Sequence, residues 1–262
     1  MSGAALRKLS GVDELLAVLD DDFARAEAGP DRVSSTWSLG SAAGWVTDSR
    51  RVPGRGHLVA LGPAQDAAAL LRAVVEQSEV ARGSTPRDST TLGSVTLPRD
   101  ADRHLPAYRL DPRNDWEWFV TRTPPPSQPG EEAAEWLPSS SDGELRDLLL
   151  AWSPRHDAEP GQAGVLRWAG IRAADGALVC AAAHTERRPG VPHLASVVTH
   201  GAHRGQGLGT AVTAWLTRTL LAEGSGWVTL GMYSDNDAAR RLYRRLGYAN
   251  DHHFTSGRLL PR

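Results

Sequence analysis

The chain has 262 residues with 29 basic and 31 acidic side chains, so its formal net charge is −2. This length suits two domains of ordinary size better than one large domain. With 40% hydrophobic and 23% charged residues, the composition excludes a disordered chain and a small disulfide-stapled scaffold. The balanced charge also lacks the basic footprint of a nucleic-acid-binding protein, and we expect no nucleic-acid partner.

The first half carries four expected elements in the order helix, strand, helix, strand. They are predicted at residues 12–28, 57–61, 67–77 and 115–121. Apolar residues at helical spacing before Gly29 and Pro30 define the first helix, and Pro63 opens the second. A proline-rich segment, TPPPSQPG at 123–130, follows and cannot feed a sheet ladder. We therefore predict an N-terminal domain over 1–122, a linker over 123–130 and a C-terminal domain over 131–262.

The second half alternates strands and helices more regularly. Helices are expected at 144–152, 210–222 and 237–246, and strands at 165–172, 177–184, 193–200, 227–233 and 248–256. Asp175-Gly176 predicts a hairpin between the first two strands. The later alternation implies parallel strands flanked by helices, and we see no internal repeat of solenoid period.

The single cysteine, Cys180, cannot form an internal disulfide, which indicates a reducing compartment and excludes a cysteine-rich metal site. Its apolar neighbours predict an inert thiol in a buried strand. That apolar run is far shorter than the roughly 20 residues that span a bilayer, and the N-terminus does not resemble a secretory signal. We expect a cytoplasmic protein with no membrane partner.

A glycine-rich segment, Arg204 to Thr210 (RGQGLGT), lies between a predicted strand and a predicted helix. Glycines let backbone amides face an anion, and a helix N-terminus adds unpaired N–H groups, so the segment predicts a phosphate cradle. The spacing departs from the dinucleotide motif G-x-G-x-x-G, and the G-K-[ST] ending of a P-loop is absent. It satisfies a third pattern, R/Q-x-x-G-x-G/A, at Arg204, Gly207 and Gly209.

The stretches SVVTHGAHRGQGLGTAVTAWL and WVTLGMYSDNDAARRLYRRLGY together resemble the GNAT superfamily of acyl-CoA-dependent N-acyltransferases. The second fills the pattern N-x-x-A-x-x-L-Y-x-x-x-G-[FY] from Asn236 to Tyr248. The resemblance covers roughly 136–256 and is most specific over 197–248. It implies an α/β (α+β) fold with a mixed central sheet flanked by helices. Some two-domain members carry a degenerate copy of the fold at the N-terminus. The order of elements expected in the first half is compatible with such a copy, which would bind no CoA.

The resemblance also implies roles for residues that match the family motif. Acetyl-CoA would be the acyl-donor substrate, and Tyr243 the general acid that protonates the departing thiolate. An amine acceptor would attack the thioester directly, without a covalent enzyme intermediate. The implied acetyl-CoA-binding residues are Val197, Val198, Thr199, Arg204, Gly205, Gln206, Gly207, Leu208, Gly209, Thr210 and Asn236.

The general base is the least determined role. Some members carry a glutamate five residues before the motif asparagine, where this chain has Gly231. The alternatives are His200, His193, Glu186 and Asp235, of which we favour His200 because it ends the strand before the glycine segment and a histidine titrates near neutrality.

Simpler interpretations stand beside these roles. His200 and His203 lack further ligands for a metal, and we expect none. The arginines at 240, 241, 244 and 245 fit a solvated helix face, although one could meet the 3′-phosphate of CoA. Tyr243 could be a packing residue with a hydrogen-bonded hydroxyl. Two rival functions remain: a CoA-binding regulatory or sensor module without turnover, and a nucleotide-binding protein. The acceptor and the oligomeric state stay open, and a homodimer is compatible with the sequence.

Overall fold

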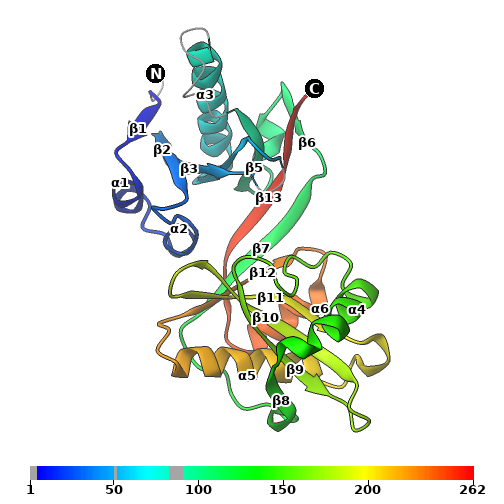
Figure 1. Cartoon of the computed structure of the whole chain (residues 1–262). Helices are drawn as coiled ribbons and strands as arrows, with labels where there is room; N and C mark the ends of the chain where they lie inside the picture. Colours follow the sequence, from blue (N-terminus) through cyan, green and yellow to red (C-terminus); the bar gives the residue numbers. More distant parts are fainter. Residues whose placement is uncertain (1–4, 50–51, 83–90) are drawn as a thin grey trace. The chain divides into compact units, whose positions relative to one another are not determined.

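The computed structural model describes residues 5–49, 52–82 and 91–262 (Figure 1). The chain divides into two compact units. Unit 1 comprises Met1–Glu117, Tyr233–Asp235 and His252–Arg262, and unit 2 comprises Trp118–Met232 and Asn236–Asp251. The proline-rich segment 123–130 thus falls within unit 2, and the last residues of the chain fall within unit 1, because they pair with a strand there. The domain limits inferred from the sequence remain a prediction.

Unit 1 is built on a mixed sheet in the order β1-β2-β3-β4-β5-β13. Its neighbours are antiparallel except for β4 and β5, which are parallel, and β6 pairs with β13. The elements of this part of the chain are β1 (Arg7–Leu9), α1 (Val12–Val18), α2 (Asp22–Glu27), β2 (Val33–Leu39), β3 (Ala42–Asp48), β4 (Gly56–Leu61), α3 (Ala64–Arg82), β5 (Leu92–Pro98), η1 (Ala101–His104), β6 (Tyr108–Leu110), β7 (Asn114–Thr121) and β13 (Ala249–Pro261).

Unit 2 has a mixed sheet in the order β7-β12-β11-β10-β9-β8, whose first strand enters it from residue 118. The pairs β8–β9, β9–β10 and β10–β11 are antiparallel, and β11 and β12 are parallel. Its elements are η2 (Glu131–Ala133), β8 (Ala134–Leu137), η3 (Ser139–Ser141), α4 (Asp142–Trp152), β9 (Val165–Arg172), β10 (Leu178–Arg188), β11 (Val191–Thr199), η4 (Gly201–His203), α5 (Leu208–Ala222), β12 (Val228–Tyr233) and α6 (Asp237–Arg245).

The two units share one topology. Each contains four consecutive antiparallel strands, then a helix, then a fifth strand parallel to the fourth; the helix is α3 in unit 1 and α5 in unit 2. The predicted fold class, a mixed sheet flanked by helices, is confirmed. The shared order also supports the hypothesis that the first half is a second copy of the same fold.

The strand β10 shows why unit 2 needs a helix on each face of its sheet (Figure 1). Successive strand residues point to opposite faces. Cys180 and Ala182 pack in a cluster with α5, whereas Ala181 and Ala183 pack in a cluster with α4. The continuous apolar run of this strand is therefore buried on both faces of the sheet. A strand with polar residues at alternate positions would place them in one of these two clusters.

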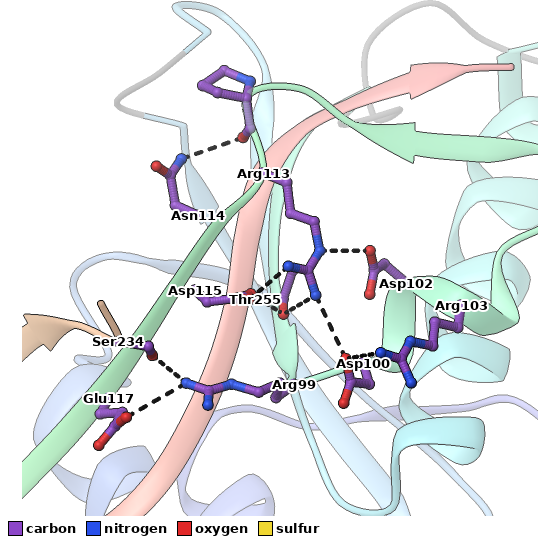
Figure 2. A network of polar contacts seen from close by, with 11 residues as sticks. Arg99, Asp100, Asp102, Arg103, Arg113, Asn114, Asp115, Glu117, Ser234 and Thr255 are labelled. Carbon is purple, nitrogen blue, oxygen red and sulfur yellow. Dashed lines mark hydrogen bonds and ion pairs between the residues drawn. The ribbon is translucent and has the colours of Figure 1, made fainter. Parts of the chain in front are cut away.

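An ionic network joins the η1 region to β7 and β13 in unit 1 (Figure 2). Arg113 lies at its centre, with Nε donating to Asp102 at 2.9 Å and Nη1 to Asp115 at 2.6 Å. The other carboxylate oxygen of Asp115 accepts a hydrogen bond from Thr255 on β13 at 2.7 Å. Within the same network, Arg99 contacts the buried Glu117 at 3.7 Å. These contacts hold β13 in register beside the end of β5.

The single helix predicted over 12–28 is wrong, because the chain forms α1 and α2 with a break at Leu19–Asp21. The side chain of Asp21 accepts a hydrogen bond from the backbone N–H of Ala24 at 2.9 Å and so caps a new helix. The strands β1, β2, β3, β5, β6 and β8 were not predicted from the sequence. Within the described ranges, no helix is both long and apolar enough to cross a membrane.

Candidate functional site

The parallel strands β11 and β12 part before β11 ends. Their pairing covers His193 with Thr229 and Leu194 with Leu230, whereas β11 continues to Thr199. The last five residues of β11 therefore extend beyond its pairing with β12, as in strands that take up an added extended chain. This is the stretch in which Val197, Val198 and Thr199 are predicted to meet the pantetheine arm.

A bulge at Ser196 marks the point of divergence. The register of β11 against β10 slips by one residue between Ala195 and Val198, and Ser196 has a positive φ of 50°. Its hydroxyl interacts with Ala158, accepting from the backbone N–H at 2.8 Å and lying 3.1 Å from the carbonyl oxygen. Sequence reasoning missed Ser196, since a serine within a strand pattern gives no signal of a left-handed backbone.

The glycine-rich segment forms the connection from β11 to α5. Gly205 and Gly207 have φ values of 78° and 84°, which favour glycine, and a Cβ on either would meet no atom within 4 Å. Gly207 is the N-cap of α5 and supplies no side-chain hydrogen bond to it. The backbone N–H groups of the first turn, Leu208 to Thr210, lack intrahelical acceptors. The turn thus presents open space and unpaired donors together, as an anion site requires.

Arg204 and Trp152 contact this connection on one side and stabilise it. Arg204 donates from Nη2 to the carbonyl oxygen of Trp152 at 2.9 Å and from Nε to that of Thr199 at 3.3 Å. A Cβ at Gly201 would lie 2.1 Å from the Trp152 ring, so glycine is required there. Arg204 therefore has a structural role in shaping the loop, in addition to the ligand contact predicted for it.

On the other side, Arg245 of α6 donates from Nη2 to the Thr210 hydroxyl at 3.0 Å. This contact places a guanidinium beside the first turn of α5, where it adds positive charge to the helix N-terminus. Gln206, at the tip of the connection, is exposed and donates weakly to the carbonyl of Ala202 at 3.4 Å. The segment therefore combines positive charge with unpaired backbone donors.

His200 caps the short helix η4 within the same connection. Its Nδ1 accepts the backbone N–H of Ala202 at 3.2 Å, and its ring lies 4.8 Å from that of Trp152. This hydrogen bond occupies the Nδ1 lone pair, so a neutral ring carries its proton on Nε2. Acting as a base would require His200 to release the cap.

Tyr243 and Tyr248 have different hydroxyl environments, although both are buried. The Tyr248 hydroxyl lies 2.7 Å from that of Thr217, whereas no described residue forms a hydrogen bond with the Tyr243 hydroxyl. The Tyr243 ring packs 5.9 Å from Phe119, and burial raises the pKa of Tyr243 to about 12. A protonated phenol without an internal partner can donate a hydrogen bond to a ligand. The alternative interpretation of Tyr243, as a packing residue, had expected its hydroxyl to be hydrogen-bonded within the protein.

Asn236 caps the helix that carries Tyr243. Its Oδ1 accepts the backbone N–H of Ala239 at 3.0 Å, which leaves its amide nitrogen for another contact. Along the same helix, Arg241 and Arg244 are exposed, whereas Arg240 pairs with Asp237. Arg245 is also exposed, although it reaches the Thr210 hydroxyl, so this arginine face is largely solvated.

Cys180 is fully buried, as the sequence predicts, and burial raises the pKa of its thiol to about 11. A thiol in this environment is a poor nucleophile at neutral pH. The rings of His200 and His203 lie 5.6 Å apart, yet the described residues contain no group of three potential metal ligands. The site therefore consists of backbone donors, a buried phenol and flanking arginines.

Comparison with protein families matches residues 169–256 to the FR47-like proteins. Among solved structures, a GCN5-related N-acetyltransferase from Sphaerobacter thermophilus is 16% identical, with a TM-score of 0.61 over 98% of this chain and 95% of that chain. A protein described as a GNAT-family acetyltransferase from Novosphingobium aromaticivorans is 18% identical, with a TM-score of 0.53 over 95% and 96%. A tandem GNAT protein from the clavulanic acid biosynthesis pathway is 14% identical, with a TM-score of 0.50 over 98% of both chains. No curated protein matches this chain.

Proposed function

From the premise that this chain is a GNAT superfamily protein, we propose that unit 2 transfers an acetyl group from acetyl-CoA to an amine. The observation that carries the proposal is the divergence of β11 from β12 directly before an open glycine turn at a helix N-terminus. One strand end can pair with an extended pantetheine arm, and the following turn can hold a diphosphate.

In the proposed reaction the amine nitrogen attacks the thioester carbonyl and forms a C–N bond. The tetrahedral intermediate then breaks its C–S bond, and the sulfur leaves as a thiolate. Tyr243 donates its phenolic proton to that sulfur, and the nitrogen loses its proton to a base or to water. The support for Tyr243 is that its ring is buried while its hydroxyl has no hydrogen-bond partner among the described residues.

The variant Y243F tests the general acid, and Y248F is the matched control. General acid–base catalysis contributes roughly 100- to 10,000-fold, so we expect Y243F to lower kcat at least 100-fold while the Kd for CoA stays within about twofold. Y248F removes a structural hydrogen bond and should cost about 1 kcal/mol of stability without a comparable fall in kcat. Steady-state kinetics on an amine panel and calorimetry with CoA measure both quantities. Equal losses of kcat in the two variants would refute the assignment.

For the base we retain the prediction of His200 and test it with H200N. The asparagine oxygen can still accept the hydrogen bond from the Ala202 amide, so the cap persists while the imidazole is lost. We expect kcat to fall with CoA affinity unchanged. An unaltered kcat would exclude His200 as the base.

A CoA-binding sensor without turnover is the second candidate. Gly231, at the position where some relatives carry a glutamate base, is exposed on β12 and supplies no carboxylate. Thiol release from acetyl-CoA against a broad amine panel separates the two functions, because a sensor would bind CoA and release none. Stabilisation by ATP or NAD but not by acetyl-CoA in a thermal-shift screen would overturn both candidates.

In unit 1 we propose that the equivalent connection binds no CoA. Only Gly62 and Pro63 separate β4 from α3, and a Cβ at Gly62 would lie 2.6 Å from the carbonyl oxygen of Ser41. A turn packed this closely on its neighbour lacks the open space found at Gly205 and Gly207. Calorimetry should therefore give one CoA site per chain, and two sites would defeat this part of the proposal.

A further inference from the structure

Unit 1 contains a cavity of about 390 Å³. The proposed transferase reaction, which takes place in unit 2, does not use it. This volume lies within the range of small-molecule sites. The cavity is formed by the α1–α2 connection, the ends of β4 and β5, and the part of β13 in this unit. The lining includes Val18, Asp20, Asp21, Leu61, His252 and Phe254.

The cavity lies where the β4–β5 ladder ends. The parallel pairing ends at Val59 and Thr96, while β4 continues to Leu61 and β5 to Pro98. In the topology shared by the two units, this corresponds to the divergence of β11 and β12. Unit 1 therefore has a pocket at the equivalent place without the open glycine turn, and this combination does not suit a diphosphate-bearing ligand.

One wall of the cavity is rigid and aromatic. Phe254 is buried and stacks on the His252 ring at 5.2 Å with an interplanar angle of 14°. Behind it, Phe23 and Trp116 pack 4.5 and 4.7 Å from the Phe254 ring. Val18 at the end of α1 and Leu61 at the end of β4 add further apolar surface. Together with the aromatic wall they can contact the apolar body of a ligand.

The network of Figure 2 anchors this wall. The backbone N–H of Arg99 donates to the carbonyl oxygen of His253 at 2.8 Å, and Phe254 pairs with Pro98 across the sheet. The Arg99 side chain also contacts the buried Glu117, which lies 3.7 Å from the His253 ring. The residues that line the cavity are thus held in place before any ligand arrives, which lowers the entropic cost of binding.

The polar part of the lining is anionic. Asp21 is within 3.0 Å of His252 and caps α2; although burial opposes ionisation, the hydrogen bonds from His252 and Ala24 leave the pKa of Asp21 below its usual value. Asp20 is exposed at the mouth, where it pairs with Arg25. Among the described residues, the lining holds two carboxylates and two histidines but no lysine or arginine. Its carboxylates therefore favour a positively charged ligand.

We propose that unit 1 binds a small molecule with a protonated amine and an apolar body. The ammonium group lies at Asp20 and Asp21, and the apolar body lies against Val18, Leu61 and Phe254. This site is separate from the acetyl-CoA site of unit 2, and the proposal does not depend on the transferase reaction.

Calorimetry on the full chain without CoA tests the proposal with three probes of one shape. Phenethylamine carries the ammonium group, 2-phenylethanol is neutral, and 3-phenylpropionate is an anion. We expect phenethylamine to bind with a Kd on the order of 1 mM and the other two to bind at least tenfold more weakly. No binding by phenethylamine, or equal binding by either other probe, would overturn the proposal.

Two variants locate the binding in unit 1. D20N removes a charge at the mouth, and V18W narrows the cavity from a half-exposed position without changing its charge. We expect each to weaken phenethylamine at least fivefold, while D13N, an exposed position outside the lining, binds like the wild type. Circular dichroism and the unchanged Kd for CoA verify that the variants are folded. Wild-type affinity in both D20N and V18W would place the amine elsewhere and refute the site.

Discussion

The proposed diphosphate site at the β11–α5 connection can be tested by changing the charge of that connection. Gln206 lies at its tip with an exposed side chain, between two glycines of positive φ. Among the described residues, its side chain makes a single long hydrogen bond of 3.4 Å, to Ala202. The variant Q206E keeps the shape of this side chain and adds one negative charge, so it perturbs a bound anion without straining the backbone.

The expected effect follows from Coulomb's law. Two unit charges about 7 Å apart interact by roughly 0.6 kcal/mol in bulk water and by about 2.4 kcal/mol at an effective dielectric constant of 20. A partly exposed turn lies between these limits, so we expect a loss of about 1–2 kcal/mol in CoA binding, or roughly 5- to 30-fold in Kd. The Debye length falls to about 3 Å at 1 M salt, and most of the loss should vanish there.

Calorimetry with CoA at low and high salt measures this difference. Q77E is the matched control, since Gln77 is exposed on α3 and the substitution changes the net charge equally. Three results would refute the reasoning: unchanged affinity in Q206E at low salt, an equal loss in Q77E, or a loss that persists at 1 M salt. The first would mean that the glycine turn does not face the diphosphate.

Two further predictions concern the stability of unit 2. Burial and, to a smaller extent, the positive charge of Arg167 lower the pKa of His184 to about 4. Between about pH 6.5 and pH 4, the unfolded chain therefore takes up a proton at this histidine that the folded protein does not. The free energy of unfolding should fall with falling pH in this window by up to about 1.4 kcal/mol per pH unit, and urea titrations of H184Q should show a shallower slope; an equal slope would contradict this. G201A places a Cβ 2.1 Å from the Trp152 ring and should lower stability by about 1–3 kcal/mol in the same assay, whereas an unchanged midpoint would show that the ring moves freely.

Local patterns predicted the elements that position the candidate site. The sequence predicted a strand at 193–200, a glycine turn and a helix at 210–222, and the structure has β11 and α5 within two residues of these limits. Such elements depend on neighbours a few positions apart, through apolar periodicity and glycine conformation. The predicted helix over 12–28 failed because a carboxylate at 21 can cap a helix in the middle of an apolar pattern.

The sequence by itself therefore determined the order of strands and α-helices from α4 onward, the glycine turn after β11 and the position of the tyrosine. Only the tertiary structure decided which hydroxyl stays without an internal partner, where β11 and β12 part, and which strand completes unit 1. That strand is β13, whose Ser256 lies opposite Thr96 of β5. Pairing of segments so far apart in the chain depends on the packing of the entire unit, which no local spacing of residues records.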